Sequence, residues 1–447
     1  MAAQSLRPPV CVIGAGLAGS EAAWQLSRRG HRADLFEMRP VRPTPVHKTA
    51  DCAELVCSNT FKSNLMDTAT GLLKEELRRC GSLILEVADR TRIPAGSALA
   101  VDREKFARGV TEALESAPGI LIHREEIREI PKDGIVIVAT GPLVSEALSA
   151  DIGRFTGRDY LYFFDAVSPI VESDSIDLSK VFRASRYGKG DEDYLNCPLD
   201  EETYGRFLDA LITATAAPHH DVEKTAFFEG CLPIEEMARR GRDTLRFGPM
   251  KPVGLVDPRT GKRPYAVVQL RQDNAAAEHY NLVGFQNSLR WGEQERIFRM
   301  IPGLEKASFV RLGMIHRNSY INAPAILLPT FQARKRTDLL FAGQVSGVEG
   351  YLESAASGLV AGLNAARLAE GVEAIVFPPT TALGALERYI SAAEVRNYQP
   401  TNMAFGLLPP LQPPVRDKKR RRDLMVKRAL EDLGSFLRDL APVPSFP

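Results

Sequence analysis

A glycine-rich turn near the N-terminus is the segment whose residue types and spacing point most directly to chemistry. It has the pattern GxGxxG and follows the apolar run VCVI. In this pattern Gly14 permits a sharp turn, Gly16 lets backbone amides approach a diphosphate, and Gly19 lets a helix pack closely on the sheet. The diphosphate would lie at the helix N-terminus, where unpaired N–H groups and the helix dipole favour negative charge. The predicted phosphate-binding residues are Gly14, Ala15, Gly16, Leu17, Ala18 and Gly19.

An acidic residue downstream supports a nucleotide site over a merely close-packed turn. Glu37 ends the next predicted strand, where its carboxylate would accept hydrogen bonds from a ribose. FAD, NAD and S-adenosylmethionine can all occupy such a unit, so the turn alone does not choose between them.

Two later segments favour FAD. IVIVATG at 135–141 is similar to the strand-plus-ATG element of the two-dinucleotide-domain flavoproteins. TDLLFAGQ at 337–344 is similar to their late motif, which places a strand end beside the flavin ribityl chain. That motif usually ends in Asp, whereas this chain has Gly343 followed by Gln344, whose amide can still hydrogen-bond a hydroxyl. A helix expected from about Ser354 would direct its N-terminus at the flavin, or would only pack tightly through its small residues.

Six cysteines, at positions 11, 52, 57, 80, 197 and 231, are the candidate nucleophiles. A thiolate is strongly nucleophilic near neutral pH, but an isolated cysteine is more often a small buried residue. Their number and spacing fit neither a disulfide scaffold nor a zinc ribbon, and the seven histidines show no ligand spacing. We therefore expect reduced thiols and no metal site.

The elements that must position these residues alternate between strands and helices at both ends of the chain. We expect an α/β fold, a Rossmann-type FAD-binding domain with an inserted mixed α+β domain. The insertion is expected because strand-like pieces and proline turns replace the alternating pattern between about 150 and 330. The predicted domains are 1–150 (FAD-binding, first part), 151–330 (inserted) and 331–447 (FAD-binding, second part, with a basic helical region).

Composition restricts the class of protein further. The 57 basic and 56 acidic side chains nearly cancel, so only local patches could attract a polyanion. No apolar run reaches the length of a membrane span, and the first residues lack the features of a secretory signal. We expect a cytoplasmic protein.

Long strings spread from residue 14 to 366 add a family resemblance. They include GAGLAGSEAAWQL, FEMRP, AELVCSNTF, PAGSALAVDR, FFEGCLPIEEMARRG, MIHRNSYINAP and AGQVSGVEGYLESAASGLVAGLNAA. The chain closely resembles the folate- and FAD-dependent tRNA (uracil-5-)-methyltransferase family, TrmFO. A sister family of larger flavoproteins, which modifies the wobble uridine of tRNA, is the alternative. Its members carry a long helical C-terminal extension, for which this chain ends too early.

The resemblance implies methylation of carbon 5 of a uridine in the tRNA T loop, at position 54, to form ribothymidine. The carbon would come from 5,10-methylenetetrahydrofolate and the reducing equivalents from NADH or NADPH through FAD. Carbon 5 of uracil is a poor nucleophile until a group such as a thiolate adds to carbon 6. A simple FAD oxidoreductase of small molecules is the rival function from another class.

The resemblance also selects two of the cysteines as catalytic. Cys231 is the expected nucleophile toward carbon 6, since it directly precedes a predicted helix start that would lower its pKa. Phe227 and Phe228 beside it would offer a stacking surface to an extruded base. Cys57 is the second candidate, placed in the flavin region by the string VCSNTF.

Cationic side chains would serve the folate carboxylates and the tRNA phosphates. Lys251 and Arg271 are candidates, and the densest basic run is 418–422 on a predicted helix at 416–433. A plain solvated helix face is the competing interpretation of that run.

Overall fold

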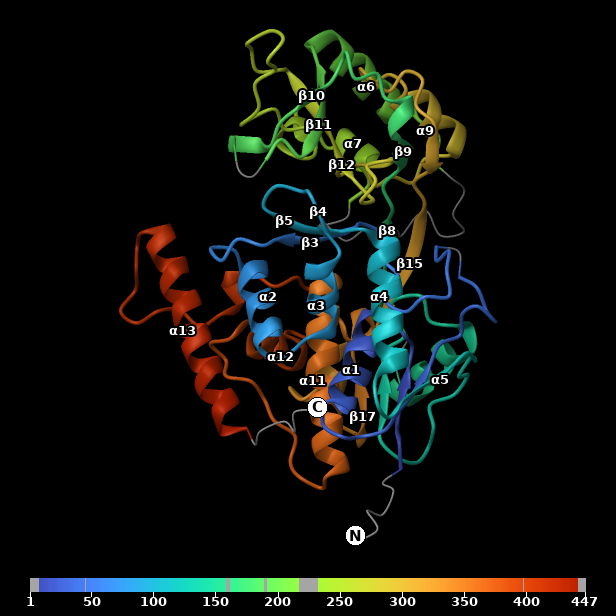
Figure 1. Ribbon diagram of the computed structural model, residues 1–447, viewed down its shortest axis with the longest axis vertical. Helices are drawn as coiled ribbons and strands as arrows, with labels where there is room; N and C mark the ends of the chain where they lie inside the picture. The colour runs from blue at the N-terminus through green and yellow to red at the C-terminus, as the bar shows by residue number, and fades with distance from the viewer. Residues whose placement is uncertain are drawn as a thin grey trace.

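The computed structural model describes residues 8–44, 46–157, 161–188, 191–216, 232–396 and 398–440, without the side chains of 161–166 and 315–317. Figure 1 shows a larger part below and a smaller part, green to gold, above it. Each part has its own buried apolar core, and the core of the smaller part runs from Val171 to Ala307. The arrangement confirms the predicted α/β fold with an inserted mixed domain.

A six-stranded sheet forms the centre of the larger part, in the order β16-β17-β7-β1-β2-β6. Every neighbouring pair is parallel except β16 with β17. The chain order reverses at β1, between β2 and β7, which is where doubly wound sheets bind ligands. The strands are β1 (Val10–Ile13), β2 (Ala33–Phe36), β6 (Ile120–His123), β7 (Val136–Val138), β16 (Gln332–Ala333) and β17 (Arg336–Phe341).

Helices surround this sheet, and two of them pack unusually closely. A Cβ on Gly358 would lie 2.2 Å from the carbonyl oxygen of Ala18, so small residues let α11 touch α1. Asp102 caps α4 (Arg103–Ser116), since its side chain accepts a hydrogen bond from the amide of Lys105. The helices are α1 (Leu17–Ser27), α2 (Ala69–Arg79), α3 (Leu83–Arg90), α4 (Arg103–Ser116), α5 (Glu146–Thr156), α10 (Ala323–Ile326), α11 (Tyr351–Ala369), α12 (Ala382–Ala392) and α13 (Lys418–Asp439).

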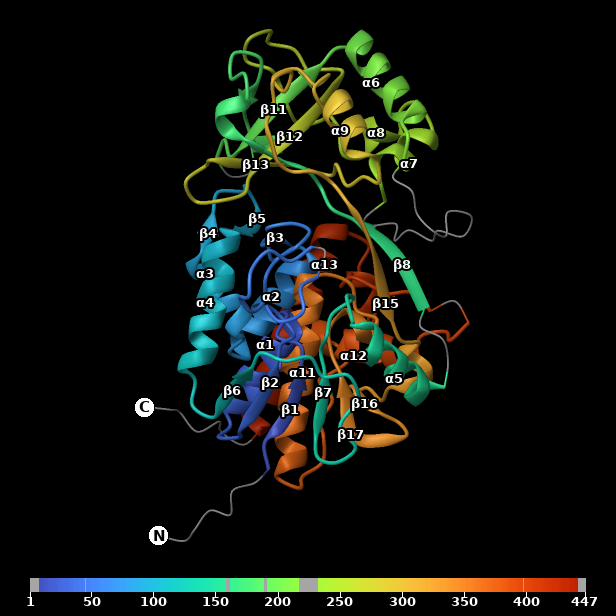
Figure 2. The ribbon, with the colours of Figure 1, turned by 90° about the vertical axis from the view of Figure 1, so that its right-hand side faces the viewer.

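A small antiparallel sheet of the larger part faces the insertion. It has the order β3-β5-β4, and Figures 1 and 2 place it directly beneath the smaller part. Its strands are β3 (Thr60–Ser63), β4 (Arg92–Ile93) and β5 (Ala98–Val101). The segment that carries Cys57 leads directly into β3, so it lies at the boundary of the two parts.

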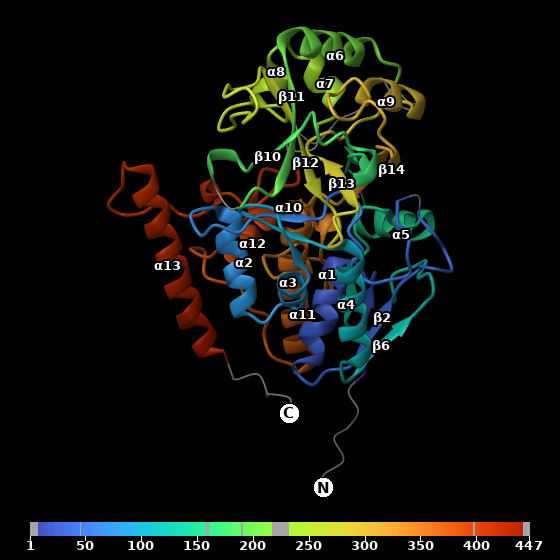
Figure 3. The ribbon, with the colours of Figure 1, turned by 45° about the horizontal axis from the view of Figure 1, so that its top comes forward.

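The inserted domain is built on a second six-stranded sheet, in the order β10-β11-β12-β13-β9-β14, with antiparallel pairing throughout. Short helices cover it (Figure 3). Its strands are β9 (Ile170–Glu172), β10 (Phe182–Arg183), β11 (Tyr194–Leu199), β12 (Ala266–Gln272), β13 (His279–Leu282) and β14 (Phe309–Arg311). Its helices are α6 (Glu201–Thr213), α7 (Ile234–Arg239), α8 (Thr244–Phe247) and α9 (Trp291–Phe298).

One two-stranded ribbon carries the chain into and out of the insertion. β8 (Leu161–Ala166) pairs antiparallel with β15 (Ile315–Tyr320), and Figure 2 shows the pair running between the two parts. No helix among the described residues is long and apolar enough to cross a membrane.

Candidate active site

The glycine turn has a backbone that larger residues could not adopt. Gly14 has a φ of +100°, and a Cβ there would lie 2.7 Å from the carbonyl oxygen of Ala139. A Cβ on Gly19 would lie 1.8 Å from the carbonyl oxygen of Gly14. At Gly16, by contrast, no atom lies within 4 Å of the position of a Cβ. The turn therefore packs closely on the sheet side and leaves open space at Gly16, where a diphosphate would approach.

A long cavity joins this turn to segments that are far away in the sequence. Eight of the predicted site residues line it: Gly14, Gly16, Leu17, Ala18, Glu37, Cys57, Gly343 and Gln344. Thr140 and Gly141 of the ATG element line it as well. Ala15 and Gly19, the other two members of the predicted turn, do not line it: the amide of Ala15 donates to Glu37, and Gly19 packs against Gly14. The structure thus brings eight of the predicted site residues around one space.

Glu37 is fixed at the end of β2 by partners that the sequence analysis did not identify. Its Oε2 accepts a hydrogen bond from the amide of Ala15 at 3.0 Å, and its Oε1 accepts from the amide and Nε of Arg39 at 3.0 and 2.9 Å. Arg39 also pairs with Glu54. Burial acts to raise the pKa of Glu37, but the adjacent Arg39 outweighs it and the pKa is lowered. The carboxylate is therefore ionised and suited to accept ribose hydroxyls.

The late motif forms the opposite wall of the cavity. The amide of Gly343 donates to Ser357 Oγ at 2.7 Å, and the side-chain amide of Gln344 donates to both oxygens of Glu349 at 2.9 and 3.0 Å. Helix α11 begins at Tyr351, three residues before the expected Ser354, because Gly350 adopts a φ of +110° immediately before it. The first turn of α11 lines the cavity, while its later glycines pack against α1. The start of α11 is therefore open to a ligand in the cavity, and its later part packs tightly through small residues.

These features together fit FAD. The room at Gly16 suits the diphosphate, Glu37 suits the ribose of the adenosine half, and Gln344 with the start of α11 suits the flavin half. Among the described residues, no group of three or more His, Cys, Asp or Glu side chains could hold a metal ion.

Cys57 lies in the wall of the same cavity, on a loop held by a tyrosine. The hydroxyl oxygen of Tyr351 accepts hydrogen bonds from the amides of Cys57 at 2.7 Å and Ser58 at 3.1 Å. Burial raises the pKa of Tyr351, so the phenol keeps its proton. The first residue of α11 thus ties the flavin side of the cavity to the cysteine loop.

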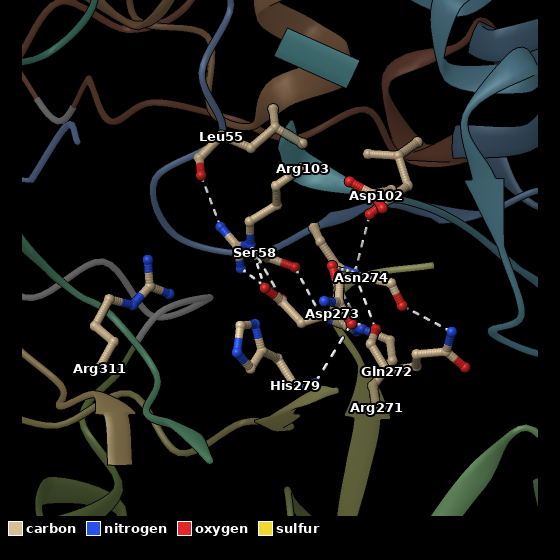
Figure 4. A network of polar contacts seen from close by, with 12 residues as sticks. Leu55, Ser58, Asp102, Arg103, Arg271, Gln272, Asp273, Asn274, His279 and Arg311 are labelled. Carbon is tan, nitrogen blue, oxygen red and sulfur yellow. Dashed lines mark hydrogen bonds and ion pairs between the residues drawn. The ribbon is translucent and has the colours of Figure 1, made fainter. Parts of the chain in front are cut away.

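Three arginines hold the other side of this loop (Figure 4). Arg103 donates to the carbonyl oxygen of Leu55 at 2.7 Å, and Arg311 donates to that of Val56 at 2.9 Å. Arg271, a candidate for folate or tRNA from the sequence, instead donates to Ser58 Oγ at 2.9 Å and to the side chain of Asn59 at 3.0 Å. Only 6% of Arg271 is exposed, so it supports the loop from within the protein.

Cys231, with Phe227 and Phe228, lies outside the described residues. The chain is described again from Leu232, and the amide of Ile234 donates to the carbonyl oxygen of Gln286 at 2.8 Å. Gln286 lines the cavity. The start of α7, three residues after Cys231, is therefore attached to the cavity wall.

The other described cysteines are unsuited to nucleophilic work. Burial raises the pKa of Cys11 and Cys80 to about 12 and that of Cys52 to about 11, and it also raises the pKa of Cys197. These four groups remain protonated thiols at neutral pH.

The basic residues of α13 form two groups: those at the start of the helix are exposed to solvent, and two further along contact other parts of the protein. The side chains of 418–421 are exposed, whereas Arg422 lies over the ring of Phe405 and Arg428 donates to the carbonyl oxygen of Pro410. Only the first turn of the helix therefore presents a cluster of cations to solvent. Lys251 is half-buried.

Comparisons with known proteins agree with this geometry. Residues 9–373 match the family model described as "Glucose inhibited division protein A", GIDA. The chain is 59% identical over 428 residues to the methylenetetrahydrofolate--tRNA-(uracil-5-)-methyltransferase TrmFO of Heliobacterium modesticaldum, covering 96% of this chain and 98% of that protein. It is 56% identical over 433 residues to the TrmFO of Halalkalibacterium halodurans, covering 97% and 99%.

A solved structure shows the same fold at low sequence identity. Aquifex aeolicus GidA aligns with a TM-score of 0.71 at 19% identity, covering 99% of this chain and 75% of that chain. With identities above 55% along almost the whole length, the family is established. The chain belongs to the GIDA family and, within it, to the TrmFO group.

Proposed function

We propose that this protein is a methylenetetrahydrofolate- and FAD-dependent tRNA (uracil-5-)-methyltransferase that acts on the T-loop uridine at position 54. The observation that carries the proposal is the 59% identity to a TrmFO protein over 96% of the chain. The reductant is NADH or NADPH. Because the substrate is tRNA, the reaction takes place in the cytoplasm.

The reaction balances with the residues and co-substrates named. Uridine, 5,10-methylenetetrahydrofolate, NAD(P)H and one proton give 5-methyluridine, tetrahydrofolate and NAD(P)⁺. The sulfur of Cys231 adds to carbon 6 of the uracil, carbon 5 bonds to the one-carbon unit and loses its proton, and the sulfur then leaves. When bound, FAD carries two electrons from the nicotinamide to the one-carbon unit.

The cavity supports a role for Cys57 close to the cofactor. Its position between Tyr351 and the arginines gives the thiol a fixed place in the wall that Gln344 and the start of α11 also form. The exposed cations of 418–421 are candidates for phosphate contacts of the tRNA. The identities of 59% and 56% to TrmFO proteins favour this function over the alternatives, a wobble-uridine enzyme or a small-molecule oxidoreductase.

Donor dependence tests the proposed function directly. Purified protein with T-loop tRNA transcript should form 5-methyluridine with methylenetetrahydrofolate and NAD(P)H, and none with S-adenosylmethionine. Methylation from S-adenosylmethionine, or none at all by a flavin-loaded protein with both donors, would contradict it.

Trapping tests the nucleophile. A T-loop RNA that contains 5-fluorouracil should form a covalent adduct with the wild-type protein and none with Cys231→Ala. Cys197→Ala is the matched control, because Cys197 is fully buried in the inserted domain and should not affect trapping. Undiminished methylation by Cys231→Ala would show that another group adds to carbon 6.

A further inference from the structure

We propose that Arg311, supported by Arg103 and Arg271, is a positioning residue that fixes the Cys57 loop and keeps the Cys57 thiol in its ionised, reactive form. The inference rests on the proposed function only where it connects Cys57 to methyl transfer. Arg271 and Arg311 belong to the inserted domain, so that domain helps to hold a loop of the FAD-binding part that lines the cavity.

Arg103 and Arg311 donate to consecutive carbonyl groups along the loop, and Figure 4 shows the bond from Arg103 to Leu55. Arg103 binds the carbonyl of Leu55, Arg311 binds that of Val56, and both reach that of Cys57, at 3.4 and 3.3 Å. The hydroxyl oxygen of Tyr351 accepts hydrogen bonds from the amides of Cys57 and Ser58, so the backbone of Cys57 is held through both its N–H and its C=O. Such complete hydrogen bonding allows the loop little freedom.

The charges around the loop do not cancel. Three guanidiniums converge there, and Asp273, the one carboxylate that contacts them in the part of the chain that the structure describes, accepts hydrogen bonds from Arg103 at 2.9 to 3.0 Å. Arg311 Nε is buried without a hydrogen-bond partner among the described residues. The cluster therefore holds excess positive charge beside the cavity.

Burial, and to a smaller extent the charge of Arg103, acts against the positive charge of Arg271 and Arg311. Burial and the neighbouring Arg103 lower the pKa of Arg311 to about 10, and burial lowers the pKa of Arg271. Burial also opposes charge on Arg103, but Asp273 outweighs it and the pKa of Arg103 is raised. A negative charge at Cys57 acts in the opposite sense on all three, so a thiolate there relieves the repulsion.

The remaining ionisable groups near the loop already have partners. Glu54 pairs with Arg39, Lys62 lies 3.7 Å from Glu353, and Tyr351 keeps its proton. Tyr194, which interacts with Arg271, has a pKa raised by burial and is neutral. Among the described residues, the three arginines and Asp273 are therefore the main source of charge beside the loop.

The test is the pH dependence of Cys57 alkylation by iodoacetamide in the FAD-loaded protein, read at the Cys57 peptide by mass spectrometry. In Arg311→Met the midpoint of the profile should rise by about one pH unit, the lower end of the usual effect of a neighbouring opposite charge. In Asp273→Asn it should fall, because removing the carboxylate increases the excess positive charge. Arg299→Met is the matched control: Arg299 also donates to a carbonyl of the inserted domain, that of Ala307, and should leave the midpoint unchanged.

Arg311→Lys separates charge from geometry. It keeps the cation and loses the two-pronged donor, so the midpoint should stay near the wild-type value while kcat for methylation falls about tenfold. An unchanged midpoint in Arg311→Met would overturn the proposal. If that variant does not fold, an unchanged midpoint in Asp273→Asn overturns it instead. Alkylation needs neither tRNA nor folate, so this result is independent of whether methylation is detected.

Discussion

The glycine turn and the Cys57 loop line the same cavity, yet they are held in place in different ways. The turn is held by contacts within one βαβ unit and with the end of the adjacent strand β7. These close contacts are possible because Gly14 and Gly19 have no side chains. The loop depends on α4, β12, β14 and α11, which lie between 46 and 294 residues away in the chain. A turn that shapes one end of a cavity can thus be local in sequence, while the cysteine loop in the same cavity wall depends on contacts from both domains.

Two alanine substitutions in the glycine turn should have the largest effects, and they should separate the loss of FAD binding from the loss of stability. Gly19→Ala puts a Cβ 1.8 Å from a backbone oxygen, so we expect the protein to lose FAD and to unfold at much lower temperature. Gly16→Ala meets no protein atom within 4 Å, so the apoprotein should keep its Tm within about 2 °C, because a surface-like change costs little. Its FAD affinity should still fall at least tenfold, since the methyl group occupies the approach to the diphosphate. Fluorescence titration with FAD and thermal melts of both apoproteins measure the two effects, and equal losses of Tm would remove the distinction between them.

The loop should be sensitive to the contact between the domains. Arg103 and Asp273 are 13% and 7% exposed, so Asp273→Asn leaves a buried guanidinium without its counter-charge. We expect a loss of roughly 3 kcal/mol in the free energy of unfolding, typical of breaking a buried pair from one side. Urea denaturation measures it. The control is Glu305→Gln, which breaks the exposed pair with Lys180 and should cost less than about 1 kcal/mol. Equal costs would show that the contact between Arg103 and Asp273 contributes no more than a surface pair.

A smaller effect should appear in the dependence of stability on pH. Lys74 is fully buried behind β3, where its Nζ donates to the carbonyl of Ser63 at 2.7 Å, and burial lowers its pKa from 10.5 to about 7. Between these values the unfolded chain binds a proton that the folded one does not, so this group makes stability rise with pH from 7 to 10.5.

Lys74→Met should therefore be more stable than the wild type at pH 7, and that advantage should shrink by at most about 1.4 kcal/mol per pH unit as the pH rises. Denaturation at pH 7, 8, 9 and 10 provides the comparison. Lys180→Met, at an exposed site, should show no such trend. An advantage of Lys74→Met that does not change with pH would mean that the buried ammonium keeps its proton.

Sequence reasoning succeeded where the determinants are short-range. The strand, the glycine turn and Glu37 follow one another within about 30 residues, and the turn requires particular residue types, so their grouping around a cavity could be anticipated. The start of α11 was placed three residues late, since the positive φ of Gly350 has no signal in the pattern of small residues.

The supports of the site were not predictable in this way. Arg39, Arg103 and Arg311 look like ordinary surface arginines in the sequence, and their carbonyl partners leave no trace in residue type. Arg271 is a sequence candidate for folate or tRNA because both ligands carry negative charge, but the loop that it binds lies more than 200 residues earlier and gives no local signal. The order of the antiparallel strands in the insertion likewise could not be predicted, because it depends on contacts between strands that are far apart in the sequence. The roles of Cys57 and Cys231 remain predictions.

The ribbon of β8 and β15 gives the insertion its entry and exit at one place. The insertion also contacts the larger part through Arg271, Asp273 and Arg311, so a tilt of the insertion about the ribbon would move these three side chains together. The reactivity of the Cys57 sulfur would then depend on the angle between the two domains. An RNA that binds to both domains would set that angle, and its shape would thereby affect the reactivity of Cys57.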